Sequence, residues 1–172
     1  MDCYRKSAVE AFEKVETLVR AWLEEERITR VDVCLNGLGD VGDTRCWLTT
    51  DGERRSVRID GSAGSAVNKL RGMQALPGRG AWFYSHLWMG MPEGVLHQES
   101  DWMCEPDMGF DEVPLGAYKT ELDRYPRDQE FIPDWLRDKV ERWRLERGPV
   151  VARRVAHLEE EFRLEGGKYR YP

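Results

Sequence analysis

The sequence predicts an α+β domain: an antiparallel sheet of about five strands with an N-terminal helix and C-terminal helices packed on it. Three observations predict this class. Apolar residues near the N-terminus recur at helical spacing, the following segments alternate between apolar and polar residues, and the last third returns to helical spacing. The resulting order of helix, strands, helix, hairpin and helices is typical of an antiparallel α+β arrangement.

The first helix is expected over residues 7–27. Its apolar residues step by four and three positions and form one stripe, made of Ala8, Phe12, Val15, Val19 and Trp22. Ser7 followed three residues later by Glu10 fits a capping box, so the helix is expected to begin at Ser7.

Three short strands are expected next, over residues 30–36, 44–50 and 53–59. In the first of them Val31, Val33 and Leu35 point to one side. The dipeptide Asp51-Gly52 between the second and third is a strong hairpin signal. A helix over residues 62–74 follows.

A long aromatic hairpin is expected from Ala81–Met89 and Val95–Cys104, joined by a turn over residues 90–94. Its first strand alternates between one face with Trp82, Tyr84, His86 and Trp88 and another with Phe83, Ser85, Leu87 and Met89. So many large side chains on both faces predict a central strand buried on both sides.

The C-terminal part is expected to form helices over residues 115–125, 133–147 and 150–164. Gly148 is placed as a helix stop and Pro149 as the first residue of the next helix. Residues 166–172 are expected to be a mobile tail. The 172 residues fit one domain, 1–172.

Composition disfavours several classes of protein. The chain has 26 basic and 32 acidic side chains, a formal net charge of −6, and basic residues in its last helices that alternate with acidic ones, so nucleic acid is not the expected partner. No apolar run reaches the roughly 20 residues of a membrane span, and the N-terminus lacks a signal-peptide core. Four scattered cysteines without a metal-binding spacing suggest free thiols. We therefore expect a cytoplasmic protein without membrane association.

The most unusual local feature is the segment from Glu93 to Glu112, named the acidic segment below. It holds seven acidic residues and no lysine or arginine, with large apolar side chains between them. Charge steers a basic partner and buried aromatic anchors supply affinity, whereas the plain alternative is a solvated loop. The predicted contact residues are Glu99, Asp101, Trp102, Glu105, Asp107, Phe110, Asp111 and Glu112.

A second interpretation is a small metal-dependent hydrolase. If the hairpin pairs symmetrically about Met91-Pro92, His86 lies opposite His97 with Glu99 on the same face, a set that could bind a metal ion. The chain has no nucleophile motif and no cofactor motif. We expect a protein that is not an enzyme, with no catalytic residues, cofactor or bound metal, and we keep the hydrolase as the alternative.

Several motifs resemble those of a known family. They are Pro77-Gly78-Arg79-Gly80-Ala81-Trp82-Phe83-Tyr84 followed by a hairpin, the turn Glu105-Pro106-Asp107, and the pair Tyr125-Pro126-Arg127-Asp128 and Ile132-Pro133-Asp134-Trp135-Leu136. Together they resemble bacterial immunity proteins of polymorphic toxin systems, in particular the YezG-like group and its actinobacterial relatives. The resemblance spans about a third of the chain.

The resemblance implies a non-catalytic α+β protein that binds and neutralises a cognate toxin domain. A toxin with a basic surface would suit the acidic segment. The sequence does not distinguish immunity from a non-catalytic adaptor role, and it leaves the oligomeric state and the toxin's activity open.

Overall fold

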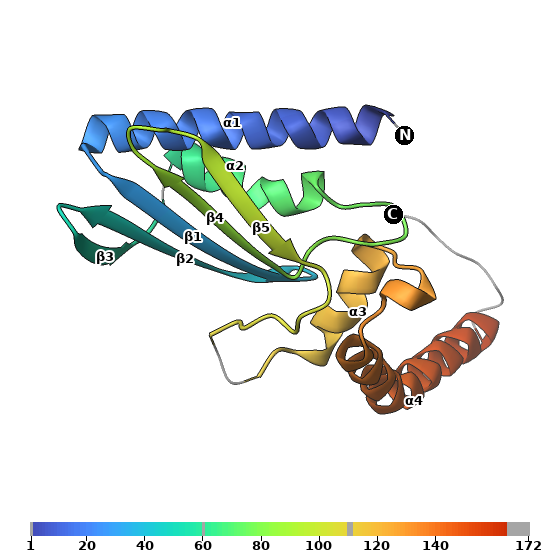
Figure 1. Ribbon diagram of the computed structural model, residues 1–172. Helices are drawn as coiled ribbons and strands as arrows, with labels where there is room; N and C mark the ends of the chain where they lie inside the picture. Colours follow the sequence, from blue (N-terminus) through green and yellow to red (C-terminus); the bar gives the residue numbers. More distant parts are fainter. Residues whose placement is uncertain (1, 60, 110–111, 165–172) are drawn as a thin grey trace.

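The computed structural model describes residues 2–59, 61–109 and 112–164. A five-stranded antiparallel sheet in the order β3-β2-β1-β4-β5 forms its centre (Figure 1). The strands are β1 (Arg30–Leu38), β2 (Val41–Thr50), β3 (Glu53–Val57), β4 (Tyr84–Gly90) and β5 (Leu96–Asp101). The helices are α1 (Asp2–Glu26), α2 (Gly61–Met73), α3 (Leu115–Arg124), a 3-10 turn (Gln129–Phe131) and α4 (Asp134–Leu164). The predicted α+β class is confirmed.

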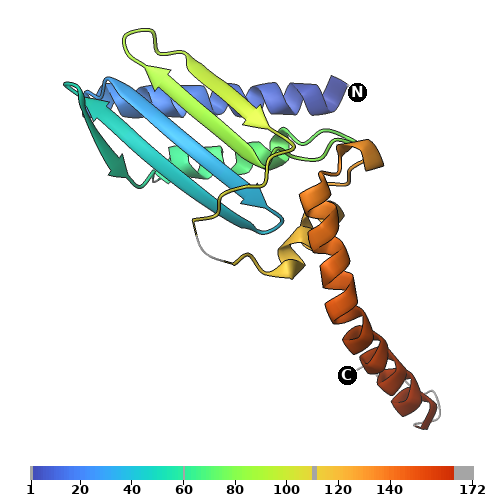
Figure 2. The ribbon, with the colours of Figure 1, turned by 60° about the horizontal axis from the view of Figure 1, so that its bottom comes forward.

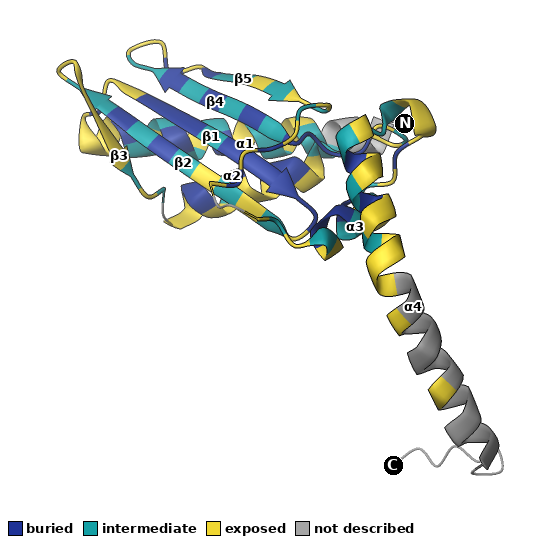
Figure 3. Ribbon diagram, turned by 90° about the horizontal axis from the view of Figure 1, so that it is seen from below, coloured by how far each residue is buried: buried dark blue, intermediate teal, exposed yellow. Residues whose placement is uncertain are grey.

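Helices α1 and α2 cover one face of the sheet, and none of the described helices lies over the strands of the opposite face (Figures 1 and 3). The main core lies between these two helices and the sheet, because alternate residues of each strand point toward the helices. It is built from Val15, Val19 and Leu23 of α1, Val67 and Leu70 of α2, and Val31, Val33, Leu35, Cys46, Leu48, Leu87 and Met89 of the strands. We call the uncovered side the open face.

The first three strands follow the predicted pattern. The alternate residues Val31, Val33 and Leu35 are buried in the core as expected. The Asp51-Gly52 hairpin also forms, with φ values of 51° and 82° that match the left-handed conformation of a tight two-residue turn.

A second, smaller core lies at the end of the sheet where α3 and the first turns of α4 pack. It contains Leu38, Phe83, Met108, Ala117, Tyr118, Leu136 and Val140. Beyond this contact α4 extends away from the sheet (Figure 2). Within the described residues no helix has an apolar stretch of the length that a bilayer span requires.

A buried ionic network joins the two cores. The carboxylate of Glu121 on α3, which is fully buried, accepts hydrogen bonds from Arg71 Nη2 at 2.8 Å and from the Gly39 backbone N–H at 2.7 Å. Arg127 Nη2 lies 3.6 Å from the same carboxylate and also donates to the Ala81 carbonyl oxygen. The network therefore ties α2, α3 and the β1–β2 turn together.

Two predicted helix boundaries are wrong. Helix α1 begins at Asp2, so Ser7 lies inside the helix and does not cap it. Helix α4 runs without a break through Gly148 and Pro149. Proline removes its own N–H from the hydrogen-bond ladder and its ring crowds the carbonyl four residues earlier, but a helix can continue past it at a cost of about 3 kcal/mol. The predicted mobile tail, residues 166–172, lies outside the described residues.

The prediction that the aromatic strand is buried on both sides is also wrong. Burial alternates along β4: Ser85, Leu87 and Met89 are buried, whereas Tyr84, His86 and Trp88 on the open face are only half-buried. Trp82 precedes the strand and packs into the main core on the helix side, away from Trp88. The predicted alternation holds within β4 but not at Trp82, and the described helices cover only one side of the strand.

Candidate partner-binding surface

Strand β5 is an edge strand of the sheet and carries two of the predicted contact residues. Its neighbour β4 sets the register, which pairs Glu99 with His86 and Asp101 with Tyr84. Because side chains alternate between the two sides of a strand, Glu99 and Asp101 share the open face. Both residues are exposed, as the sequence predicts for a binding surface.

Asp101 has a second, structural role. Its Oδ1 accepts hydrogen bonds from the backbone N–H groups of Met103 at 2.7 Å and Cys104 at 3.0 Å. Such an Asx turn ends the strand and redirects the chain. A substitution at Asp101 would therefore disturb the local backbone as well as the surface charge.

The acidic side chains after the strand are exposed but have basic neighbours. Asp107 pairs with Arg45 at 3.0 Å, and this hydrogen bond holds the pKa of Asp107 below its usual value. Glu105 lies 3.9 Å from Lys139 of α4. A hollow of about 210 Å³ is lined by these acids, Glu112, Lys139 and Arg142. The charge of this part of the acidic segment is partly balanced within the chain.

The charge on β5 and on the turn before it is not balanced in this way. Glu99 forms no ion pair with any residue that the structure describes, and Glu93 has only His97, at 3.8 Å. Glu99 is therefore an exposed carboxylate that no basic residue of the described chain balances, and Glu93 has only an imidazole beside it.

Trp102, a predicted anchor, is partly buried, and two other predicted residues are not described. Trp102 packs against the main core, and its indole Nε1 is buried without a hydrogen-bond partner among the described residues. Its inward position follows the alternation of β5, because Asp101 lies on the open face and the next residue therefore points to the side covered by the helices. Phe110 and Asp111 lie outside the described residues.

The register assumed for a metal site is also wrong. His86 lies opposite Glu99, and His97 lies opposite Trp88. His86 Nε2 is 3.0 Å from Asp32 Oδ1, and the His97 ring stacks on Trp88 with centroids 5.2 Å apart. Among the described residues, no group of three histidine, cysteine or acidic side chains is placed to hold a metal ion.

The open face contains a polar cluster that the sequence reasoning missed. Asp32, in the middle of β1, accepts two hydrogen bonds from Arg30 at 2.7 and 2.8 Å as well as the contact from His86. The Arg30 guanidinium holds the pKa of the Asp32 carboxyl below its usual value. The available signal was the alternation of Asp32, Cys34 and Asn36 with apolar residues, which marks a central strand with a polar side.

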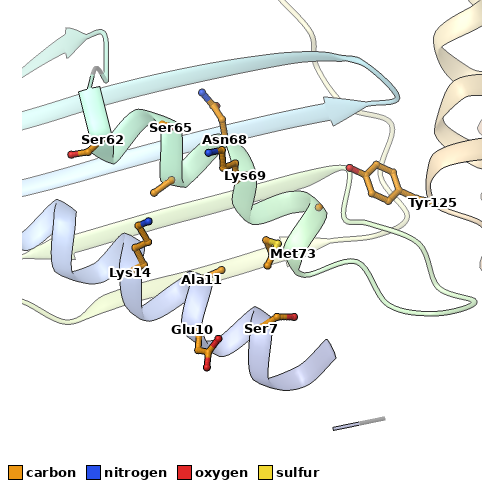
Figure 4. Close-up of a pocket in the computed structure, with 12 residues that line it drawn as sticks. Ser7, Glu10, Ala11, Lys14, Ser62, Ser65, Asn68, Lys69, Met73 and Tyr125 are labelled. Atoms are coloured by element: carbon orange, nitrogen blue, oxygen red, sulfur yellow. The ribbon is translucent and has the colours of Figure 1, made fainter. Parts of the chain in front are cut away.

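A separate groove of about 610 Å³ lies between α1 and α2 (Figure 4). Its lining includes Ala11 and Lys14 of α1, Ser65 and Lys69 of α2, and Tyr125 beyond α3. Among the described residues that line it there is no predicted contact residue, histidine or cysteine. The groove is therefore distinct from the acidic segment.

The sequence was also compared with known proteins. No protein-family model matches the chain, and no curated protein matches its sequence.

Proposed function

We propose that this chain is an immunity protein, which neutralises a cognate toxin domain by binding it. The observation that carries the proposal is the exposed acidic edge strand: Glu99 on β5 faces solvent beside an uncovered sheet face, without an ion pair among the described residues. A surface of this kind favours a basic protein partner, because complementary charge speeds encounter and suppresses wrong partners. The resemblance of the motifs at residues 78–83 and 125–136 to immunity proteins supplies the class of partner.

The apolar residues at the ends of β5 add to this support. Val95 before the strand is 41 % exposed, and Met103 after it is 46 % exposed. Exposed apolar side chains next to unpaired charge are the usual composition of a binding surface, in which apolar contacts supply affinity and charge supplies selectivity.

The proposal predicts a salt-sensitive complex. Tagged protein incubated with lysate of its native host should retain one basic protein in stoichiometric amount at low salt and less of it at high salt, as identified by mass spectrometry. The double variant Glu93→Lys/Glu99→Lys should bind the purified partner with an association rate lowered roughly tenfold and with a weaker salt dependence.

The matched control is Glu24→Lys/Glu25→Lys. These two acids are exposed on α1, on the opposite side of the sheet from the open face, so the net charge changes equally. The control should bind like the unaltered chain. Equal rates for both double variants would refute a role for the acidic edge strand.

A further inference from the structure

The open face carries a row of side chains across four strands. The register places Trp47 of β2, Asp32 of β1, Trp88 of β4 and His97 of β5 side by side. Asp32 thus lies between two indoles at the centre of the uncovered sheet face. Aromatic rings beside carboxylates are the groups that recognise guanidinium and ammonium ions in proteins.

Two arginines of the chain itself occupy such positions on the β1–β3 half of this face. The Arg54 guanidinium carbon lies 4.7 Å from the centroid of the Trp47 ring, a cation–π distance. Arg30 forms a two-pronged contact with the Asp32 carboxylate. In this half of the face, the aromatic ring and the carboxylate that could bind an arginine are therefore already occupied by arginines of the chain itself.

The β4–β5 half offers the same kinds of groups without a cation. The Trp88 ring stacks on the imidazole of His97, with centroids 5.2 Å apart, and lies beside the tilted imidazole of His86 at 4.9 Å, and Glu99 is on the neighbouring strand. Within the described residues no lysine or arginine lies over the Trp88 or Tyr84 ring or pairs with Glu99. The two halves of the face thus differ in charge, basic toward β3 and acidic toward β5.

We propose that the β4–β5 half of the open face docks an arginine- or lysine-bearing segment of the protein partner, with Trp88 and Tyr84 contacting the cation and Glu99 pairing with it. The inference rests on the proposed function and names the part of the partner that binds. Charge complementarity selects this occupant: the register pairs Glu99 with His86 and Asp101 with Tyr84, and Glu93 lies 3.8 Å from His97. These carboxylates would repel the phosphates of a nucleic acid. The apolar Val95 and Met103 flank the same half.

The seven tryptophans provide reporters for a direct test with a hexa-arginine peptide. Indole N–H signals in a two-dimensional NMR spectrum would be recorded during titration of the full chain, and Trp88→Phe would assign the Trp88 signal. The Trp88 signal should move most and that of Trp47 less, because Arg54 already covers that ring. The buried Trp82 signal should not move.

Variants turn the titration into a quantitative test. The replacement Trp88→Ala should lower the affinity for the peptide roughly two- to thirtyfold, the range expected for a cation–π contact. The replacement Trp88→Phe should lower this affinity less. Replacement Glu99→Gln should weaken it about two- to fivefold. The control Glu24→Lys/Glu25→Lys should leave the affinity unchanged.

Three results would overturn the inference: a Trp88 signal that does not move, equal shifts with hexaglutamate, or tighter binding of a single-stranded oligonucleotide than of the peptide. These outcomes are separable from a failure of the proposed function. If the chain captures a toxin but Trp88 does not respond to hexa-arginine, only the docking surface is wrong. If Trp88 responds but no toxin is captured, only the immunity function is wrong.

Discussion

Replacing Glu121 with alanine is expected to lower the free energy of unfolding by roughly 3–5 kcal/mol, the cost of breaking a buried ion pair. The side chain is fully buried, accepts hydrogen bonds from Arg71 and the Gly39 backbone N–H, and forms an ion pair with Arg127. Without it, two buried guanidinium groups would lose their carboxylate. Burial lowers the pKa of Arg127, and the negative charge of Glu121 raises it again. Urea denaturation followed by tryptophan fluorescence measures the change.

The neighbouring acid on the same helix is the control for this prediction. Asp123 is exposed and pairs with Lys119 one turn away on α3. Surface pairs of this kind contribute little, so Asp123→Ala should change the free energy of unfolding by no more than about 0.5 kcal/mol. A similarly small effect for Glu121→Ala would show that the buried network does not hold the two cores together.

Replacing Gly39 with alanine is expected to destabilise the chain by about 3–5 kcal/mol, through overpacking and left-handed strain together. Gly39, in the β1–β2 turn, has a φ of +61°, and an added Cβ would lie 2.5 Å from the backbone carbonyl oxygen of Ala117. A backbone atom of α3 cannot move aside as a flexible side chain can. The substitution would also displace the backbone N–H of residue 39, which donates a hydrogen bond to the Glu121 carboxylate.

The matched control is Gly52→Ala in the next hairpin turn. Gly52 has a φ of +82°, but an added Cβ there would meet no heavy atom within 4 Å. Only the left-handed strain remains, so a loss of about 1–2 kcal/mol is expected. Thermal or urea unfolding of both variants separates the clash from the strain, and equal losses would mean that α3 does not pack closely on the turn.

Local sequence signals predicted most of the fold. The alternation of Val31, Val33 and Leu35 and the Asp51-Gly52 pair are short-range patterns whose physical cause lies within a few residues. The errors arose where the packing of segments that are distant in the sequence determines which side chains are buried. Whether the Trp88 side of β4 is covered depends on where α1 and α2 dock, which alternation within the strand does not specify.

The candidate site shows the same limit. A hairpin register shifted by two residues keeps every side chain on the same side of its strand, so periodicity could not distinguish His86 opposite His97 from His86 opposite Glu99. Trp102 packs against the main core because it follows Asp101, which lies on the open face, so alternation along β5 places the indole on the side covered by the helices. By contrast, the exposure of Glu99 and Asp101 was predictable from charge alone.

The most direct test of the central claim is protection of growing cells. The partner captured by the chain would be expressed from an inducible promoter in a bacterial host, together with the unaltered chain, Glu93→Lys/Glu99→Lys or Glu24→Lys/Glu25→Lys. The account predicts that the partner stops growth, that the unaltered chain and the α1 control restore it, and that the β5 variant restores it less at equal protein level. A partner that is harmless when expressed alone, or toxicity that the unaltered chain does not relieve, would contradict the assignment as an immunity protein.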